Sequence, residues 1–139
     1  MFKKYSLPGF FLLLMIFALS CNTSRRTIAV EDGWEILGEL TVNFARDHDA
    51  LQVNSTTKYT AIRFKVEKRE IKLKGLQIVF SNLDKLSPVI DEVIPADQYS
   101  RIIELGVEGK EIRSLEFNYH TTGNLLKGRA KVLVFGKRY

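Results

Sequence analysis

Apolar and polar residues alternate with a period of two along most of the chain after residue 33. In the segment 112–120, for example, Leu115, Phe117 and Tyr119 share one parity, and the residues between them are polar. This period is typical of a strand with one buried face, because successive side chains of a strand point to opposite faces. The same pattern predicts strands over 34–44, 50–53, 59–66, 71–80, 89–94, 101–105, 112–120 and 130–135.

Two details of the alternation carry structural predictions. In the first segment, Trp34, Ile36, Leu40, Val42 and Phe44 fall on one parity and are expected to face the core. In the segment 71–80, the parity of the apolar residues changes across Lys74-Gly75, and a glycine at such a change predicts a β-bulge. Between the first two strands, Asp47-His48-Asp49 predicts a turn.

The spacing of the strands defines the fold class. No stretch shows sustained helical periodicity with start and stop signals. About eight or nine short strands in a chain of 139 residues are typical of an all-β sandwich or barrel. We therefore expect a single antiparallel β-sandwich over residues 34–136, followed by a short tail at 137–139.

The first twenty residues have the features of a secretory signal peptide. Lys3 and Lys4 precede an apolar stretch at 7–19, which Pro8 and Gly9 interrupt near its start. An apolar region of this length fits a signal peptide and is shorter than the roughly 20 residues that a membrane-spanning helix needs. Residues 1–20 are therefore expected to direct export.

The end of the apolar stretch resembles the lipobox of bacterial lipoproteins. It reads Ala18-Leu19-Ser20-Cys21, and Cys21 is the only cysteine of the chain. The resemblance implies that Cys21 carries a diacylglycerol and, after cleavage, a further acyl chain on its amine, which together anchor the protein to a membrane. Two alternatives remain open: an ordinary signal peptide cut near Ser20 with an incidental thiol at Cys21, and an uncleaved anchor helix.

The segment that follows is expected to be a flexible tether at 21–33, because its residues are polar or turn-forming and show no clear period. Residues 22–26 contain no acidic side chain. This favours the outer membrane, with the domain facing the periplasm, as the location of the protein.

Five runs of residues, in this order, are similar to a family of small secreted bacterial β-sandwich proteins of unknown function. The resemblance extends over nearly the whole predicted mature chain and implies a β-sandwich framework without an assigned activity. The runs are Trp34-Glu35-Ile36-Leu37-Gly38, Ile78-Val79-Phe80-Ser81-Asn82, Ser100-Arg101-Ile102-Ile103-Glu104-Leu105, Ile112-Arg113-Ser114-Leu115-Glu116-Phe117-Asn118-Tyr119 and Gly128-Arg129-Ala130-Lys131-Val132-Leu133-Val134-Phe135-Gly136.

Composition narrows the function classes. Hydrophobic residues make up 45% of the chain and charged residues 27%, as in an ordinary globular protein. A net charge of +5 permits attraction to anionic surfaces, but it lacks the concentrated basic character of a nucleic-acid-binding domain. A single cysteine excludes a disulfide framework within the chain and, with two histidines, a four-ligand cysteine–histidine metal site. No cofactor or metal is predicted.

The most prominent candidate surface is basic. If the segments 59–66 and 71–80 pair as a hairpin, six positive side chains share one face. Such a face could bind an anionic glycan, a lipid head group or an acidic protein, although lysines on strands also serve to prevent edge-to-edge aggregation. The six residues are Arg63, Lys65, Lys68, Arg69, Lys72 and Lys74.

Signals for catalysis are weaker. No phosphate-binding loop, metalloprotease helix or nucleophile elbow is present, and no catalytic residue is predicted. His120 shares a polar strand face with Glu116 and Asn118, and Trp34 is expected in the core rather than on a sugar-binding surface. We therefore expect a non-catalytic binding or structural module that recognises an envelope protein or glycan, with a carbohydrate- or peptidoglycan-acting hydrolase as the alternative.

Overall fold

The protein is all-β. The computed structural model describes residues 30–42, 48–120 and 128–139, and these residues form nine strands and no helix. The strands are β1 (Trp34–Thr41), β2 (His48–Gln52), β3 (Lys58–Glu67), β4 (Ile71–Phe80), β5 (Lys85–Leu86), β6 (Glu92–Ile94), β7 (Ile103–Glu104), β8 (Lys110–His120) and β9 (Lys131–Arg138).

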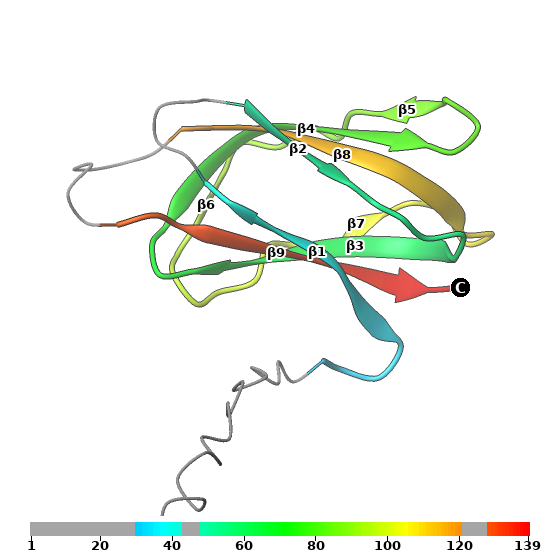
Figure 1. Ribbon diagram of the computed structural model, residues 1–139, viewed down its shortest axis with the longest axis horizontal. Coiled ribbons are helices and arrows are strands. Elements are labelled where there is room, and N and C mark those ends of the chain that lie inside the picture. The colour runs from blue at the N-terminus through cyan, green and yellow to red at the C-terminus, as the bar shows by residue number, and fades with distance from the viewer. Residues whose placement is uncertain (1–29, 43–47, 121–127) are drawn as a thin grey trace, which may run out of the picture.

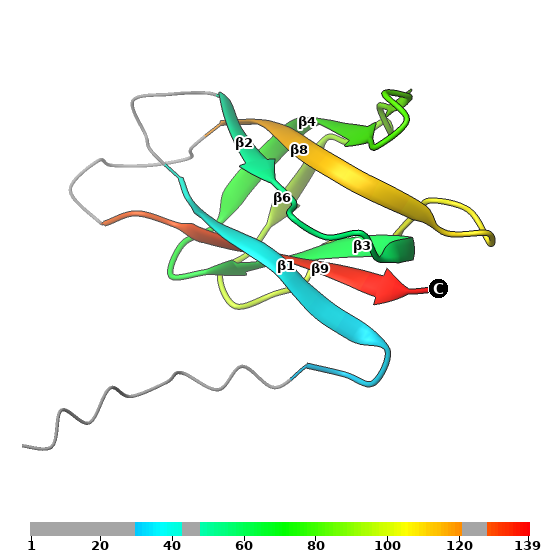
Figure 2. The same cartoon turned by 45° about the vertical axis from the view of Figure 1, so that its right-hand side comes forward.

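The strands form one antiparallel sheet that curls into two layers (Figures 1 and 2). The first layer has the order β1-β9-β3-β7, and the second has β2-β8-β4 with β5 and β6 along the far side of β4. The layers are joined where the start of β3 pairs with the start of β8, at Lys58↔Glu111 and Tyr59↔Lys110. Opposite this junction, β1 and β2 are neighbouring edge strands that no ladder connects among the described residues.

The hydrophobic core lies between the two layers. Val132 and Val134 of β9 and Phe64 of β3 face it from the first layer, and Leu115 and Phe117 of β8 face it from the second. The rings of Phe64 and Phe117 meet edge to face with their centroids 5.3 Å apart. Such a pair contributes about 0.5–1.5 kcal/mol beyond its buried area, so this contact helps to hold the layers together.

A bulge in β1 reverses the expected orientation of its first residues. Ile36 pairs with Phe135 and Gly38 with Val134, so Leu37 is the extra residue. Beyond the bulge, Leu40 and Val42 face the core as predicted. Before it, Trp34 and Ile36 lie on the outer face of the first layer, opposite Lys137 and Phe135, and the prediction that they face the core is wrong. Phe44 lies outside the described residues.

Two other expectations have opposite outcomes. The register between β4 and β8 shifts between Leu73 and Gly75, which confirms the predicted bulge at Lys74-Gly75. The predicted turn at 47–49 is wrong for His48 and Asp49, because both belong to β2 and pair with Asn118 and Phe117. Local turn propensity is overcome there by the ladder to β8. Asp47 lies outside the described residues.

The short strands between β4 and β8 are only partly as expected. The segment predicted at 89–94 forms a strand over Glu92–Ile94, and the one predicted at 101–105 forms a strand over Ile103–Glu104. β5 lies between the segments 71–80 and 89–94, where no strand was predicted. β9 continues to Arg138, two residues past the predicted end of the domain.

Candidate functional site

A cleft of about 330 Å³ opens between β1 and the chain that follows β2, and we call it the β1–β2 cleft. β1 and β2 approach each other at Gly38, where the side chain of Leu51 packs against the glycine backbone. The cleft extends from Gly38 toward the start of β1. Its lining residues are Glu35, Ile36, Leu37, Gln52, Val53, Asn54, Ser55 and Tyr59.

A chain of hydrogen bonds joins the polar residues of the cleft. The Thr57 amide donates to Ser55 Oγ at 3.1 Å, and Ser55 Oγ lies 3.0 Å from the Tyr59 hydroxyl. The Tyr59 hydroxyl donates to Glu35 Oε1, and Arg138 Nε donates to Glu35 Oε2 at 2.6 Å. If Ser55 donates to Tyr59, every hydrogen bond in this series is donated in the direction of the Glu35 carboxylate. The carboxylate accepts from Tyr59 on one oxygen and from Arg138 on the other.

These hydrogen bonds shift the pKa values of Glu35 and Tyr59. The hydrogen bond from Tyr59 lowers the pKa of Glu35, and Arg138 lowers it further, against the opposing effect of burial. Burial raises the pKa of Tyr59, and so does its bond to the Glu35 carboxylate. At neutral pH the cleft therefore holds an ionised carboxylate and a neutral phenol.

The tyrosine at the base of the cleft is fixed by close packing. Tyr59 is fully buried. Its ring lies over Gly136 of β9, where an added Cβ would come within 2.6 Å of Tyr59 Cδ1 and 3.1 Å of Leu37 Cδ1. Only a residue without a side chain leaves room for the ring, so Gly136 sets the depth of the cleft.

None of these residues was a candidate from the sequence. Glu35 is on the polar parity of its segment, residues 54–57 look like a break between strands, and Tyr59 looks like an ordinary strand residue. The interactions join residues that are 24 and 103 positions apart in the chain. Strand periodicity contains no signal for such contacts, because they depend on how distant strands pair.

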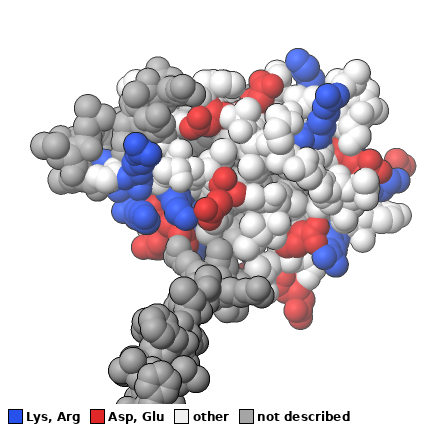
Figure 3. Space-filling model, viewed as in Figure 1, with Lys and Arg blue, Asp and Glu red and all other residues white. Residues whose placement is uncertain are grey.

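The six basic residues do not form the single face that was predicted. β3 pairs with β9 and β7, whereas β4 pairs with β8, β5 and β6, so the hairpin between β3 and β4 on which the single basic face depended does not form. The connection at residues 68–70 passes from one layer to the other. As a result, Arg63 and Lys65 lie on the outer face of the first layer, and Lys72 and Lys74 belong to the second. On the face shown in Figure 3, basic side chains alternate with acidic ones.

Several of these cations are engaged within the protein. The Arg63 guanidinium lies between the rings of Trp34 and Tyr99, 4.3 and 4.4 Å from their centroids, and the residue is only 9% exposed. Lys72 Nζ lies 3.4 Å from Asp91 Oδ1. Among the others, Arg69 donates to the Gly128 carbonyl at 2.9 Å, Lys65 is half-buried beside Glu67 and Tyr99, and Lys68 and Lys74 are exposed.

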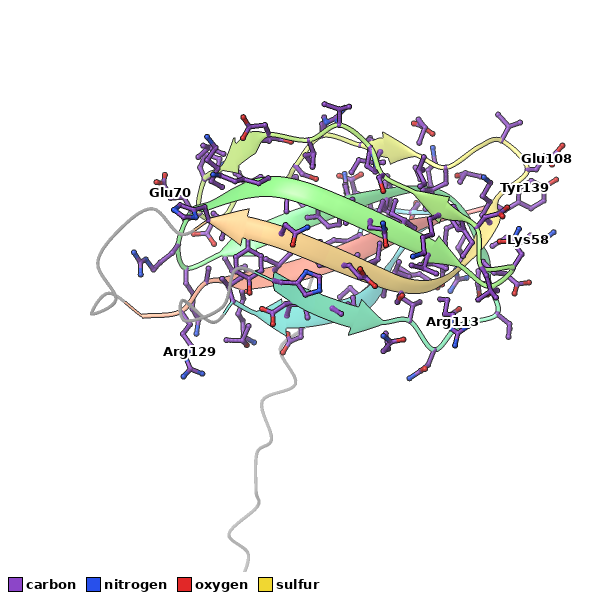
Figure 4. All side chains as sticks on the ribbon, turned by 90° about the horizontal axis from the view of Figure 1, so that it is seen from above. Lys58, Glu70, Glu108, Arg113, Arg129 and Tyr139 are labelled. Atoms are coloured by element: carbon purple, nitrogen blue, oxygen red, sulfur yellow. The ribbon has the colours of Figure 1, made fainter. Side chains whose placement is uncertain are left out.

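The histidines lie on the outer face of the second layer, which Figure 4 shows with β2, β8 and β4 side by side. His48 Nδ1 is 2.9 Å from Asn118 Oδ1, and His120 is opposite Lys72 on β4. Both histidines are exposed. Within residues 30–42, 48–120 and 128–139, no three His, Cys, Asp or Glu side chains are placed to hold a metal ion.

The predicted signal peptide, Cys21 and most of the tether lie outside the described residues. In the part of the chain that the structure does describe, no helix is long and apolar enough to cross a membrane. The last residues of the predicted tether are described, and they contact the first layer through Glu31, whose Oε2 is 3.2 Å from Arg63 Nη2.

These features define a class of small two-layer β-protein with a polar cleft at its open edge. The chain belongs to the family described as "Domain of unknown function (DUF2541)", whose model matches residues 10–136. This agrees with the expectation of a family without an assigned activity. No curated protein and no solved structure matches the chain.

Proposed function

We propose that the protein is a lipid-anchored module of the cell envelope that binds a glycan, without chemistry, in the β1–β2 cleft. The observation that carries this proposal is the polar lining of the cleft. Gln52, Asn54 and Ser55 offer amide and hydroxyl groups beside the Glu35 carboxylate. Amides, hydroxyls and carboxylates together supply the donors and acceptors that sugar hydroxyls need.

The dimensions and the charge of the cleft also favour a small, neutral part of a glycan. Its volume of about 330 Å³ is at the lower end of the range for small-molecule sites. Arg138 pairs with Glu35, and none of the described residues that line the cleft is a cation that would select an anionic ligand. Leu37 and Val53 supply apolar surface for the ring carbons of a sugar.

A hydrolase is less well supported. Glycoside hydrolysis usually needs two carboxyl groups across the scissile bond, one of them protonated. Among the described lining residues, Glu35 is the only carboxylate, and its pKa is lowered rather than raised. Ser55 is bonded to a tyrosine whose pKa is raised, and a neutral phenol is a poor base for activating a nucleophile.

The anchor rests on the sequence alone. Lys3 and Lys4, the apolar stretch at 7–19 and the sole cysteine directly after Ser20 support lipidation of Cys21. The absence of acidic residues at 22–26 supports the outer membrane, with the domain in the periplasm. The acyl chains would then hold the domain beside the bilayer and within reach of envelope glycans or of a partner protein.

Binding can be measured by calorimetry with soluble peptidoglycan fragments as the probe. We expect saturable binding that weakens roughly tenfold in the double variant Gln52→Ala/Asn54→Ala, because each lost hydrogen bond is worth about 0.5–1.5 kcal/mol. Gln98→Ala is the matched control, since Gln98 is exposed and lies outside the cleft. Binding that is absent, or equally strong in both variants, would contradict the cleft as the site, and fragment cleavage would favour the hydrolase.

The anchor has a separate test. Cells that express the protein should incorporate labelled palmitate into it, and the protein should fractionate with the outer membrane. Cys21→Ala should remove the label and release the protein, whereas Ser24→Ala, a nearby change outside the motif, should do neither. Label that persists in Cys21→Ala would show that the lipid is attached elsewhere.

A further inference from the structure

The turn at residues 31–33, directly before β1, is fixed against the first layer. The Trp34 amide donates to the Glu31 carbonyl at 3.0 Å and closes a turn over Asp32 and Gly33. The Gly33 carbonyl accepts from the Arg138 amide at 2.8 Å. In Figures 1 and 2 this blue segment lies below β1 and β9, on the side away from β2, β8 and β4. The chain toward Cys21 therefore leaves the domain from the first layer.

Arg63 holds this segment to the outer face of the first layer. Its guanidinium pairs with Glu31 at 3.2 Å while it stacks between Trp34 and Tyr99. Cation–π attraction is strongest where the cation is desolvated, and the Arg63 side chain is almost fully buried. The point at which the tether leaves the domain is thus part of the packed structure.

The same face exposes the residue types that favour a membrane interface. Trp34 is half-buried, and Tyr99 and Ile36 are each 40% exposed. Tryptophan and tyrosine are enriched at the level of lipid head groups because their rings are amphipathic. The ion pair Lys131–Glu39, 3.1 Å between Nζ and Oε1, also lies on this side, and its two charges compensate each other as the face approaches a bilayer.

The length of the tether limits the distance between the first layer and the membrane. The nine peptide units between Cys21 and Val30 span at most about 30 Å. We propose that the outer face of the first layer rests on the bilayer interface, through Trp34, Ile36 and Tyr99, when the Cys21 acyl chains are inserted. This inference depends on the lipid anchor of the proposed function. In this orientation the second layer faces away from the membrane.

Trp34 is the only tryptophan of the chain and can report on the contact directly. The lipidated mature protein is reconstituted into phosphatidylcholine vesicles, some of which carry brominated acyl chains. We expect bromolipids to quench Trp34 emission, and the iodide quenching constant to fall severalfold relative to detergent-free Cys21→Ala protein in solution. The matched control is Trp34→Phe/Ala50→Trp, which moves the fluorophore to an exposed site on β2 in the second layer and should be quenched by iodide but not by bromolipid.

The outcomes separate the inference from the proposal that it rests on. Protein that does not float with vesicles, and carries no palmitate, would overturn the anchor. Protein that floats, but whose Trp34 is quenched by iodide and not by bromolipid, would overturn the contact alone. Protection from iodide without bromolipid quenching would mean that a second copy of the protein covers the face, which also contradicts contact with lipid.

Discussion

Removal of one hydroxyl group should reveal how the cleft is held together. Tyr59→Phe keeps the ring that packs over Gly136, but removes the donor to Glu35 and the acceptor next to Ser55. Because Tyr59 is fully buried, water at the ring does not replace the hydrogen bonds that the hydroxyl made. Glu35 keeps Arg138 and is partly accessible to water, since its side chain is 24% exposed.

The cost follows from the charge of the acceptor. A hydrogen bond to an ionised group contributes about 1.5–3 kcal/mol, and water can replace part of it at Glu35, so we expect a loss of about 2 kcal/mol at pH 7. In acid, below the folded pKa of Glu35, which is lowered from 4.5, the carboxyl becomes protonated. A neutral hydrogen bond is roughly half as strong, and the loss should shrink to about 1 kcal/mol.

Urea unfolding followed by the fluorescence of Trp34 measures both values, because the chain has one tryptophan and is within the size range of two-state domains. Tyr119→Phe is a useful control, since its hydroxyl also donates to a carboxylate, Asp49, but lies outside the cleft lining. It should destabilise the fold without weakening glycan binding. A loss below about 0.5 kcal/mol for Tyr59→Phe at pH 7, or equal losses at pH 7 and in acid below the folded pKa of Glu35, would refute the hydrogen-bond chain described above.

Three further changes have defined outcomes. Glu35→Gln should flatten the dependence of the unfolding free energy on acid pH. The lowered pKa of Glu35 stabilises the wild type above the unfolded pKa near 4.5, and this stabilisation is lost as the pH falls through the folded pKa. The urea midpoints of the two proteins should therefore converge in acid. Phe64→Ala should cost about 3–5 kcal/mol by opening a cavity against Phe117, whereas a loss under 1 kcal/mol in thermal or urea unfolding would contradict a packed contact between the layers. Gly136→Ala should cost about 1–3 kcal/mol and weaken glycan binding as well, because the new methyl group displaces Tyr59; unchanged calorimetric binding would show that the ring position does not matter.

The sequence predicts the strands better than their partners. Strict alternation identifies the buried face of β8, and Gly75 marks a true bulge in β4. The bulge at Leu37 is also followed by a glycine, Gly38, but Ile36 and Leu40 on its two sides share one parity, so the alternation shows no change there. A single extra residue moves every side chain before it to the opposite face, which placed Trp34 outside the core.

The functional residues depend on pairing between distant strands. β3 and β4 are adjacent in sequence, yet they belong to different layers, so their basic side chains separate. Conversely, Glu35 on β1, Tyr59 on β3 and Arg138 on β9 meet because β9 lies between the other two strands. Local periodicity determines which way a side chain points, but the order of strands determines what it meets.

Chemical-shift mapping by NMR tests the central claim, a ligand-binding cleft at the open edge between β1 and β2, most directly. Titration of the protein with soluble peptidoglycan fragments should shift the amide resonances of residues 35–37, 52–55 and 59, and leave the outer face of the second layer, including His120, unchanged. Shifts confined to other parts of the domain, or no shifts at saturating ligand, would contradict the account.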